Sequence, residues 1–99
     1  MHCLTVIYPA PADAARFKAY YAATHVPLAK ALPGLKSCSF AYPEALGPAP
    51  VPFCIFQAWF EDRAALFAAL QSEIGKRVAE DVPNYSPTGA TLFHFPAGA

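Results

Sequence analysis

Four stretches of the chain have the residue pattern of β-strands, and helical patterns separate them. Residues 3–8, 35–42, 53–60 and 88–95 combine alternation with many β-branched and aromatic side chains. Prolines and glycines bound these stretches, and segment 44–52 holds so many prolines that we expect a loop there. The pattern therefore predicts the order strand, helix, strand, strand, helix, strand.

The first predicted helix begins near Pro11 and Asp13, which suit the first turn of a helix. One helical face is then marked at intervals of three and four residues by Phe17, Tyr20, Tyr21, Thr24 and Leu28. Pro27 has no N–H to donate, and its ring clashes with the carbonyl of Ala23. We therefore expect this helix to break or kink near His25.

The second helical region divides into two helices. Glu61–Asp62 can cap a helix that continues to Leu70, and Ser72 can cap another that covers residues 73–82. We expect Pro83 to end the last helix, because proline removes a backbone donor and clashes with the preceding turn.

This order of elements is typical of the ferredoxin-like βαββαβ fold, an α+β class with a four-stranded antiparallel sheet. Neither face of that sheet is polar, because Ile55 and Trp59 alternate with Phe56 and Phe60 in the third strand. Helices can cover only one face of such a sheet. We therefore expect a homodimer in which two sheets pack back to back.

Composition supports the same interpretation. Hydrophobic residues make up 56% of the 99 residues, and charged residues make up only 14%, against about 25% in typical domains. We expect one domain over residues 1–99 with a core at about 3–95. So much apolar surface on a small domain indicates a partner or ligand surface.

Charge and cysteine usage exclude several classes of protein. Seven basic and seven acidic residues balance, and the basic residues form no stripe, so we expect no nucleic-acid partner. The first eight residues do not resemble a signal peptide, and no apolar run is long enough to span a membrane, so we predict a cytosolic protein with no membrane partner. The isolated residues Cys3, Cys38 and Cys54 predict reduced thiols and no metal site.

Three motifs resemble the EthD family of the dimeric α/β-barrel superfamily. They are the Tyr20–Tyr21…His25…Pro27–Leu28 element, Pro33–Gly34–Leu35, and the segment from Ser72 to Tyr85. The resemblance covers residues 3–95 and implies a ferredoxin-like fold, a homodimer, and a cavity for a small apolar molecule between helices and sheet. The family's namesake accompanies an ether-degrading cytochrome-type monooxygenase system, and superfamily relatives include cofactor-free monooxygenases, isomerases, cyclases and haem-binding enzymes.

His25 is the leading candidate for catalysis, with Tyr21 on the same helical face and Asp81 in the last motif. A histidine can take and return a proton near neutral pH, but it can equally bond carbonyls freed at a helix break. Asp81 could orient His25 or a ligand, or it could fix the following turn by accepting from backbone amides.

Aromatic side chains are the candidate ligand-binding residues, although such residues more often form the core. They are Tyr20, Tyr42, Phe56, Trp59 and Tyr85. Three functions remain open: a binder or cofactor-independent enzyme for an apolar or aromatic molecule, a non-catalytic accessory dimer for an oxidoreductase, and a haem binder through His25. The first predicts a cavity of roughly 300 Å³ or more at the imidazole.

Overall fold

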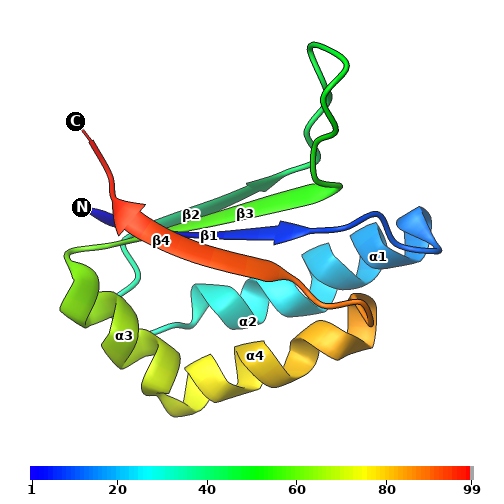
Figure 1. The fold of residues 1–99 in the computed structure, drawn as a ribbon. Coiled ribbons are helices and arrows are strands. Elements are labelled where there is room, and N and C mark those ends of the chain that lie inside the picture. The colour runs from blue at the N-terminus through cyan, green and yellow to red at the C-terminus, as the bar shows by residue number, and fades with distance from the viewer. Residues whose placement is uncertain (99) are drawn as a thin grey trace.

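The computed structural model describes residues 1–98 as a four-stranded antiparallel sheet with helices against one of its faces (Figure 1). The elements in chain order are β1 (His2–Tyr8), α1 (Ala14–Tyr20), the π-helical turn η1 (Tyr21–His25), α2 (Val26–Lys30), β2 (Ser37–Ala41), β3 (Cys54–Phe60), α3 (Arg63–Gln71), α4 (Glu73–Tyr85) and β4 (Thr91–Pro96). The strand order is β2-β3-β1-β4, and every neighbouring pair is antiparallel. The predicted α+β, ferredoxin-like fold is therefore confirmed.

Three polar residues cap the helices through backbone amides. The carboxylate of Asp13 accepts from the Arg16 amide at 3.0 Å, and that of Asp62 accepts from the Ala65 amide at 2.8 Å. The Ser72 hydroxyl accepts from the third amide of α4. Each cap satisfies a donor that the helix itself leaves unpaired.

Pro27 does not break the first helical region. The turn before it widens, so that the Val26 N–H bonds to the Tyr21 carbonyl five residues back. The chain then continues directly into α2, with Pro27 in its first turn, where a missing N–H removes no helical bond. The expected break is replaced by a π-helical turn, which contains the His25 backbone.

Pro83 does not end α4, contrary to the sequence prediction. The helix runs on to Tyr85 and contains Pro83. The last turn is held by the Ser86 N–H, which donates to the Val82 carbonyl at 2.8 Å, and by the buried Tyr85 ring. Proline costs the helix one hydrogen bond, and these contacts offset that loss.

The helices cover one face of the sheet and leave the other face uncovered. Leu4, Val6, Phe56, Ala58 and Phe60 point toward the helices and are buried. The opposite side, here called the open face, carries Thr5, Ile55, Gln57, Trp59, Phe93 and Phe95. The open face is less uniformly apolar than predicted, because Gln57 donates to Thr5 at 3.3 Å near its centre.

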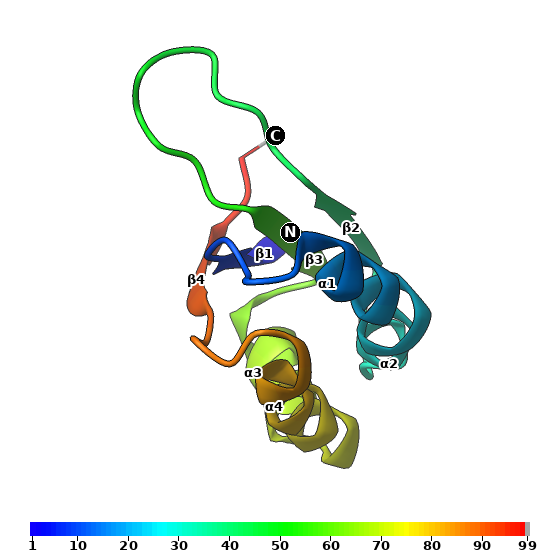
Figure 2. The same cartoon turned by 90° about the vertical axis from the view of Figure 1, so that its right-hand side faces the viewer.

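A proline-rich arm, residues 42–53, joins β2 to β3 and rises on the side of the sheet away from the helices (Figures 1 and 2). Its tip residue Leu46 is fully exposed. Within residues 1–98, no helix has both the length and the apolar character needed to cross a membrane.

Candidate functional site

His25 and Asp81 form a hydrogen-bonded pair between the first helical region and α4. The His25 Nδ1 atom lies 2.9 Å from the Asp81 Oδ2 atom. The His25 side chain is only 4% exposed and that of Asp81 only 11%. The π-helical turn places His25 against Tyr21, whose ring is stacked on the imidazole at 5.4 Å between centroids. The Tyr85 ring covers the imidazole from α4 at 4.6 Å.

Asp81 accepts hydrogen bonds from three side chains. Besides His25, the Tyr20 hydroxyl donates to Oδ1 at 2.5 Å and the Asn84 amide donates to the same oxygen at 3.0 Å. These are side-chain donors, so the alternative in which Asp81 fixes the following turn through backbone amides is not what the structure shows. Asp81 instead joins α1, η1 and α4.

The surroundings set the protonation of this pair. Burial alone would raise the pKa of Asp81, but hydrogen bonds from Tyr20, Asn84 and His25 outweigh burial and lower the pKa below its usual value. Burial lowers the pKa of His25, and the Asp81 carboxylate opposes this only in part. At neutral pH Asp81 is therefore ionised and His25 is neutral.

That charge state determines the tautomer of His25. A carboxylate can only accept hydrogen bonds, so we assign the imidazole proton to Nδ1, facing Asp81. The Nε2 atom then carries the free electron pair. Nε2 has no hydrogen-bond partner within residues 1–98. No side-chain nitrogen or oxygen in this range is both unpaired and completely buried. Nε2 therefore keeps some accessible area and can accept a proton.

The imidazole lines a small apolar hollow between the sheet and the helices, here called the His25 cavity. It is bounded by β1, β3, β4, α2 and α4, and its volume is about 80 Å³. Its walls include Leu4, Val6, Phe56, Val78 and Val82, and Leu92 lies at its edge. The cavity is much smaller than the roughly 300 Å³ predicted from the sequence, so that prediction of its size is wrong.

Two comparisons by sequence place the chain among known proteins. The EthD domain family matches residues 10–88. An uncharacterised 11.0 kDa protein of Rhodococcus erythropolis, encoded in the thcB–thcC intergenic region, is 33% identical over 93 residues. That match covers 93% of this chain and 90% of the relative. The chain belongs to the EthD family.

Solved structures share the fold of this EthD protein over almost its whole length. An EthD family protein from Bacillus halodurans superposes with a TM-score of 0.88 at 23% identity, covering 99% of both chains. A variant of a cofactor-independent oxygenase from Streptomyces nogalater has a TM-score of 0.64 at 18% identity, covering 97% of this chain and 90% of its own. At these identities the likeness is one of fold.

Most of the candidate residues of this EthD protein lie around His25, but in different surroundings. Phe56 lines the His25 cavity. Tyr20 and Tyr85 line a second, more open hollow of about 220 Å³, which lies between α1 and the end of α4. Tyr21 is fully buried, and its hydroxyl donates toward Tyr8 at 3.5 Å. Tyr21 is therefore a packing neighbour of His25 and is not part of the cavity wall.

Two of the candidate ligand-binding residues lie away from His25. Trp59 belongs to the open face, on the other side of the sheet from His25, because it pairs with Cys3 and alternates with the buried Ala58. Tyr42 packs on Phe53 at 5.5 Å, with the Lys18 ammonium 4.6 Å from its ring centroid. Neither side chain lines the His25 cavity.

Two residues of the EthD site were missed as site residues by sequence reasoning. Tyr8 lines the His25 cavity from the end of β1, and its position on the same strand face as Leu4 and Val6 could have indicated this. Asn84 was not named among the candidate site residues, although its spacing of three from Asp81 on a helix permits the bond that the structure shows. No three side chains of metal-binding type lie together within residues 1–98.

Proposed function

We propose that this EthD protein binds a small apolar molecule at the His25 cavity and that His25 acts on it as a general acid/base without a cofactor. One observation carries the proposal: a neutral imidazole, held through Nδ1 by an ionised carboxylate, lines a hollow whose other walls are almost entirely apolar. An oriented carboxylate–histidine pair in apolar surroundings is well suited to proton transfer. A fold neighbour is a cofactor-independent oxygenase, which supports the choice of cofactor-free chemistry.

The test is a ligand titration followed at His25 itself. Proton and ¹⁵N chemical shifts of the imidazole distinguish the Nδ1–H tautomer from the Nε2–H tautomer and report contact at Nε2. We expect xenon or acetone, both smaller than benzene, to shift the Nε2 signal. Val78→Phe, which fills the His25 cavity, should abolish that shift, whereas Val51→Phe on the exposed arm should preserve it.

An unchanged Nε2 signal with every small apolar probe, in protein that is otherwise intact, would count against the proposal. The alternative of a non-catalytic accessory dimer for an oxidoreductase would then gain support. That alternative also predicts that His25→Gln leaves the activity of the assembled system unchanged.

The residues around His25 do not fit a haem. A volume of about 80 Å³ is small even for benzene, which occupies an engineered cavity of about 150 Å³. Nδ1 is engaged by Asp81, and a porphyrin at Nε2 would have to displace side chains of both the sheet and α4. We derive no step through haem.

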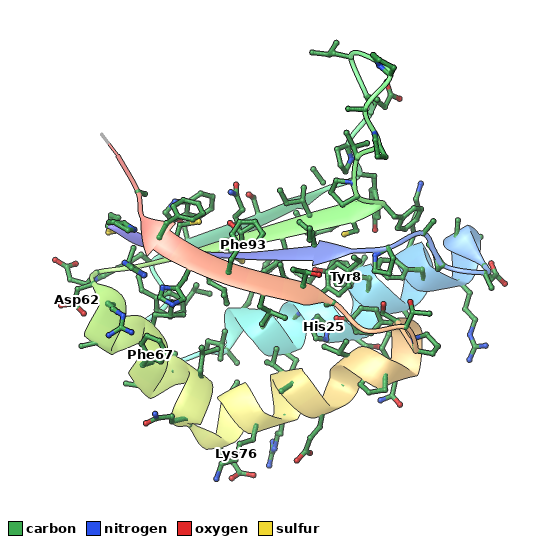
Figure 3. All side chains as sticks on the ribbon, in the orientation of Figure 1. Tyr8, His25, Asp62, Phe67, Lys76 and Phe93 are labelled. Carbon is green, nitrogen blue, oxygen red and sulfur yellow. The ribbon has the colours of Figure 1, made fainter. Side chains whose placement is uncertain are left out.

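The homodimer expected from the sequence is part of the same proposal. Figure 3 shows Phe93 on the side of the sheet away from the helices, where no helix or strand within residues 1–98 covers it. Phe93 is 44% exposed and Phe95 is 37% exposed, and their rings lie side by side. A second copy stacked on the open face would remove this apolar surface from water. The cytosolic location stays a prediction from the sequence.

A further inference from the structure

The His25 cavity presents two side chains that can form hydrogen bonds, His25 and Tyr8, and its other lining residues are apolar or glycine. They come from different layers: Tyr8 ends β1 in the sheet, and His25 ends the π-helical turn. Figure 3 shows both between the sheet and α4. A ligand in this cavity therefore lies against an imidazole and a tyrosine side chain within an otherwise apolar wall.

The hydroxyl of Tyr8 belongs to a cluster of three tyrosines that leaves it able to donate. Tyr21 donates toward the Tyr8 oxygen at 3.5 Å, and the Tyr85 oxygen lies 2.8 Å from it, with either as donor. A phenol hydroxyl can donate one hydrogen bond and can accept others through the electron pairs of its oxygen. When both neighbours donate to Tyr8, its own proton is free to bond a ligand atom. Turning the hydroxyl hydrogens is enough to reach this arrangement, and no ring needs to move.

Tyr8 is a donor and not a base in this site. Burial raises its pKa above the ordinary value for tyrosine, so the hydroxyl keeps its proton throughout the neutral range. Its ring is held edge-on by Phe17 at 5.6 Å and by Tyr21 at 5.4 Å. A fixed, protonated hydroxyl in an apolar wall is the arrangement that stabilises negative charge as it develops on a ligand oxygen.

We propose that the substrate is a small apolar ketone or enone with an acidic C–H next to its carbonyl group, and that Tyr8 binds the carbonyl oxygen while His25 removes the proton. This inference rests on the proposed function of His25. The Nε2 electron pair takes the proton from carbon, the C–H electrons form the C=C bond of an enolate, and the carbonyl π electrons move onto oxygen. Tyr8 stabilises that oxygen by a hydrogen bond without losing its proton. Return of the proton from Nε2 to the same or a conjugated carbon gives exchange or isomerisation, with no net oxidation.

The size of the cavity limits what it can enclose. About 80 Å³ is room for the reacting end of a molecule. Leu92 lies at the edge of the cavity and is 56% exposed. The apolar remainder of a larger substrate would extend past this residue, beneath β4.

Deuterium exchange tests the inference directly. We would incubate the protein with butanone or cyclopentanone in D₂O and follow loss of the α-proton signals by NMR, against buffer alone. We expect wild-type protein to accelerate exchange and His25→Gln to abolish the acceleration. Tyr8→Phe should reduce the acceleration about 10²-fold or more, as removal of one oxyanion donor does elsewhere. Tyr42→Phe removes a hydroxyl outside the cavity and should exchange like wild type.

The outcomes separate the two proposals. Full exchange by a folded Tyr8→Phe variant, with His25→Gln inactive, would overturn the role of Tyr8 and leave His25 as the base. Equal exchange by His25→Gln and wild type would overturn the proposed function itself. No acceleration by wild type would overturn the ketone substrate class. If Tyr8→Phe does not fold, a second measurement replaces it: the ¹³C signal of carbonyl-labelled cyclopentanone bound to the His25→Gln variant. We expect the Tyr8 hydrogen bond to shift this signal downfield. The absence of that shift would refute the inference.

Discussion

Asp81 accepts three hydrogen bonds through two oxygens, and the substitution Asp81→Asn tests how much depends on its charge. Tyr20 and Asn84 donate to Oδ1, and His25 donates to Oδ2. An amide of the same shape has only one acceptor oxygen. Whichever way it is turned, it presents an NH₂ group either to His25 or to the two donors on the other side. At least one partner is therefore lost or must change its proton arrangement.

The cost in stability follows from the kind of bond that is lost. A hydrogen bond to a charged group contributes about 1.5–3 kcal/mol, and both members of the His25–Asp81 pair are largely shielded from water. Asn84 is exposed, so water can replace its bond. We therefore expect Asp81→Asn to lower the free energy of unfolding by about 2 kcal/mol at pH 7. Urea denaturation at one fixed protein concentration measures this, because the stability of a dimer depends on concentration.

The dependence on pH distinguishes charge from packing. The pKa of Asp81 is lowered in the folded protein, so its charge stabilises above about pH 4, and that stabilisation is lost as the pH falls through the folded-state pKa. The pKa of His25 is also lowered. Below about pH 6.5 the unfolded chain therefore binds a proton that the folded chain does not, and stability falls. Without Asp81, nothing opposes the effect of burial on His25, so the variant loses more in this range.

The difference between wild type and Asp81→Asn should accordingly widen as the pH falls from 7 into the histidine range and then collapse below about pH 4. A difference that stays constant from pH 7 to pH 3 would refute the electrostatic explanation. The ¹⁵N spectrum gives an independent check. If the amide turns its NH₂ toward His25, the imidazole must move its proton to Nε2, and general-base activity at Nε2 should fall by orders of magnitude, as in serine proteases with the corresponding change.

Three further variants test other features of the structure. Gly75→Ala would place a methyl group against backbone carbonyls of α3, so we expect a loss of about 1–3 kcal/mol in thermal or urea unfolding; Gly47→Ala in open space should change little. Phe93→Asp on the open face should shift the protein from dimer to monomer in sedimentation, whereas Ala68→Asp on the exposed side of α3 should not. Tyr20→Phe removes one donor from the carboxylate and should move the acid unfolding transition to higher pH.

The sheet and its helices could be predicted because their signals are local. Alternating apolar residues indicated all four strands, and Asp62 and Ser72 indicated the starts of α3 and α4. The error at Pro83 arose because a local rule ignored tertiary contacts. The last turn of α4 tolerates Pro83 because Tyr85, two residues further on, is buried in the core. The rule that proline ends a helix considers only the lost hydrogen bond and does not include the stabilisation from burying Tyr85.

The composition of the site was less predictable than the fold. His25 and Asp81 could be named as candidates, but their bond joins residues 56 positions apart, and no periodicity reports a contact between two helices. Tyr8 was not recognised as a site residue because a tyrosine at the end of an apolar strand has the same pattern whether it fills the core or faces a cavity. The face on which Trp59 lies could not be predicted for the related reason that alternation separates the two faces of a strand without saying which face meets the helices.

Pro27 connects the fold to the chemistry proposed for it. An α-helix through this point would leave the Ala23 carbonyl facing a proline that cannot donate to it. The chain avoids this by widening the turn from Tyr21 to His25, and the wider turn brings the two rings into a stack with an interplanar angle of 19°. The imidazole then reaches Asp81 on α4 with Nδ1, and its other nitrogen is left for the cavity. The irregularity that sequence rules treat as a helix break is thus the feature that positions the proton acceptor, as π-helical turns often do at functional sites.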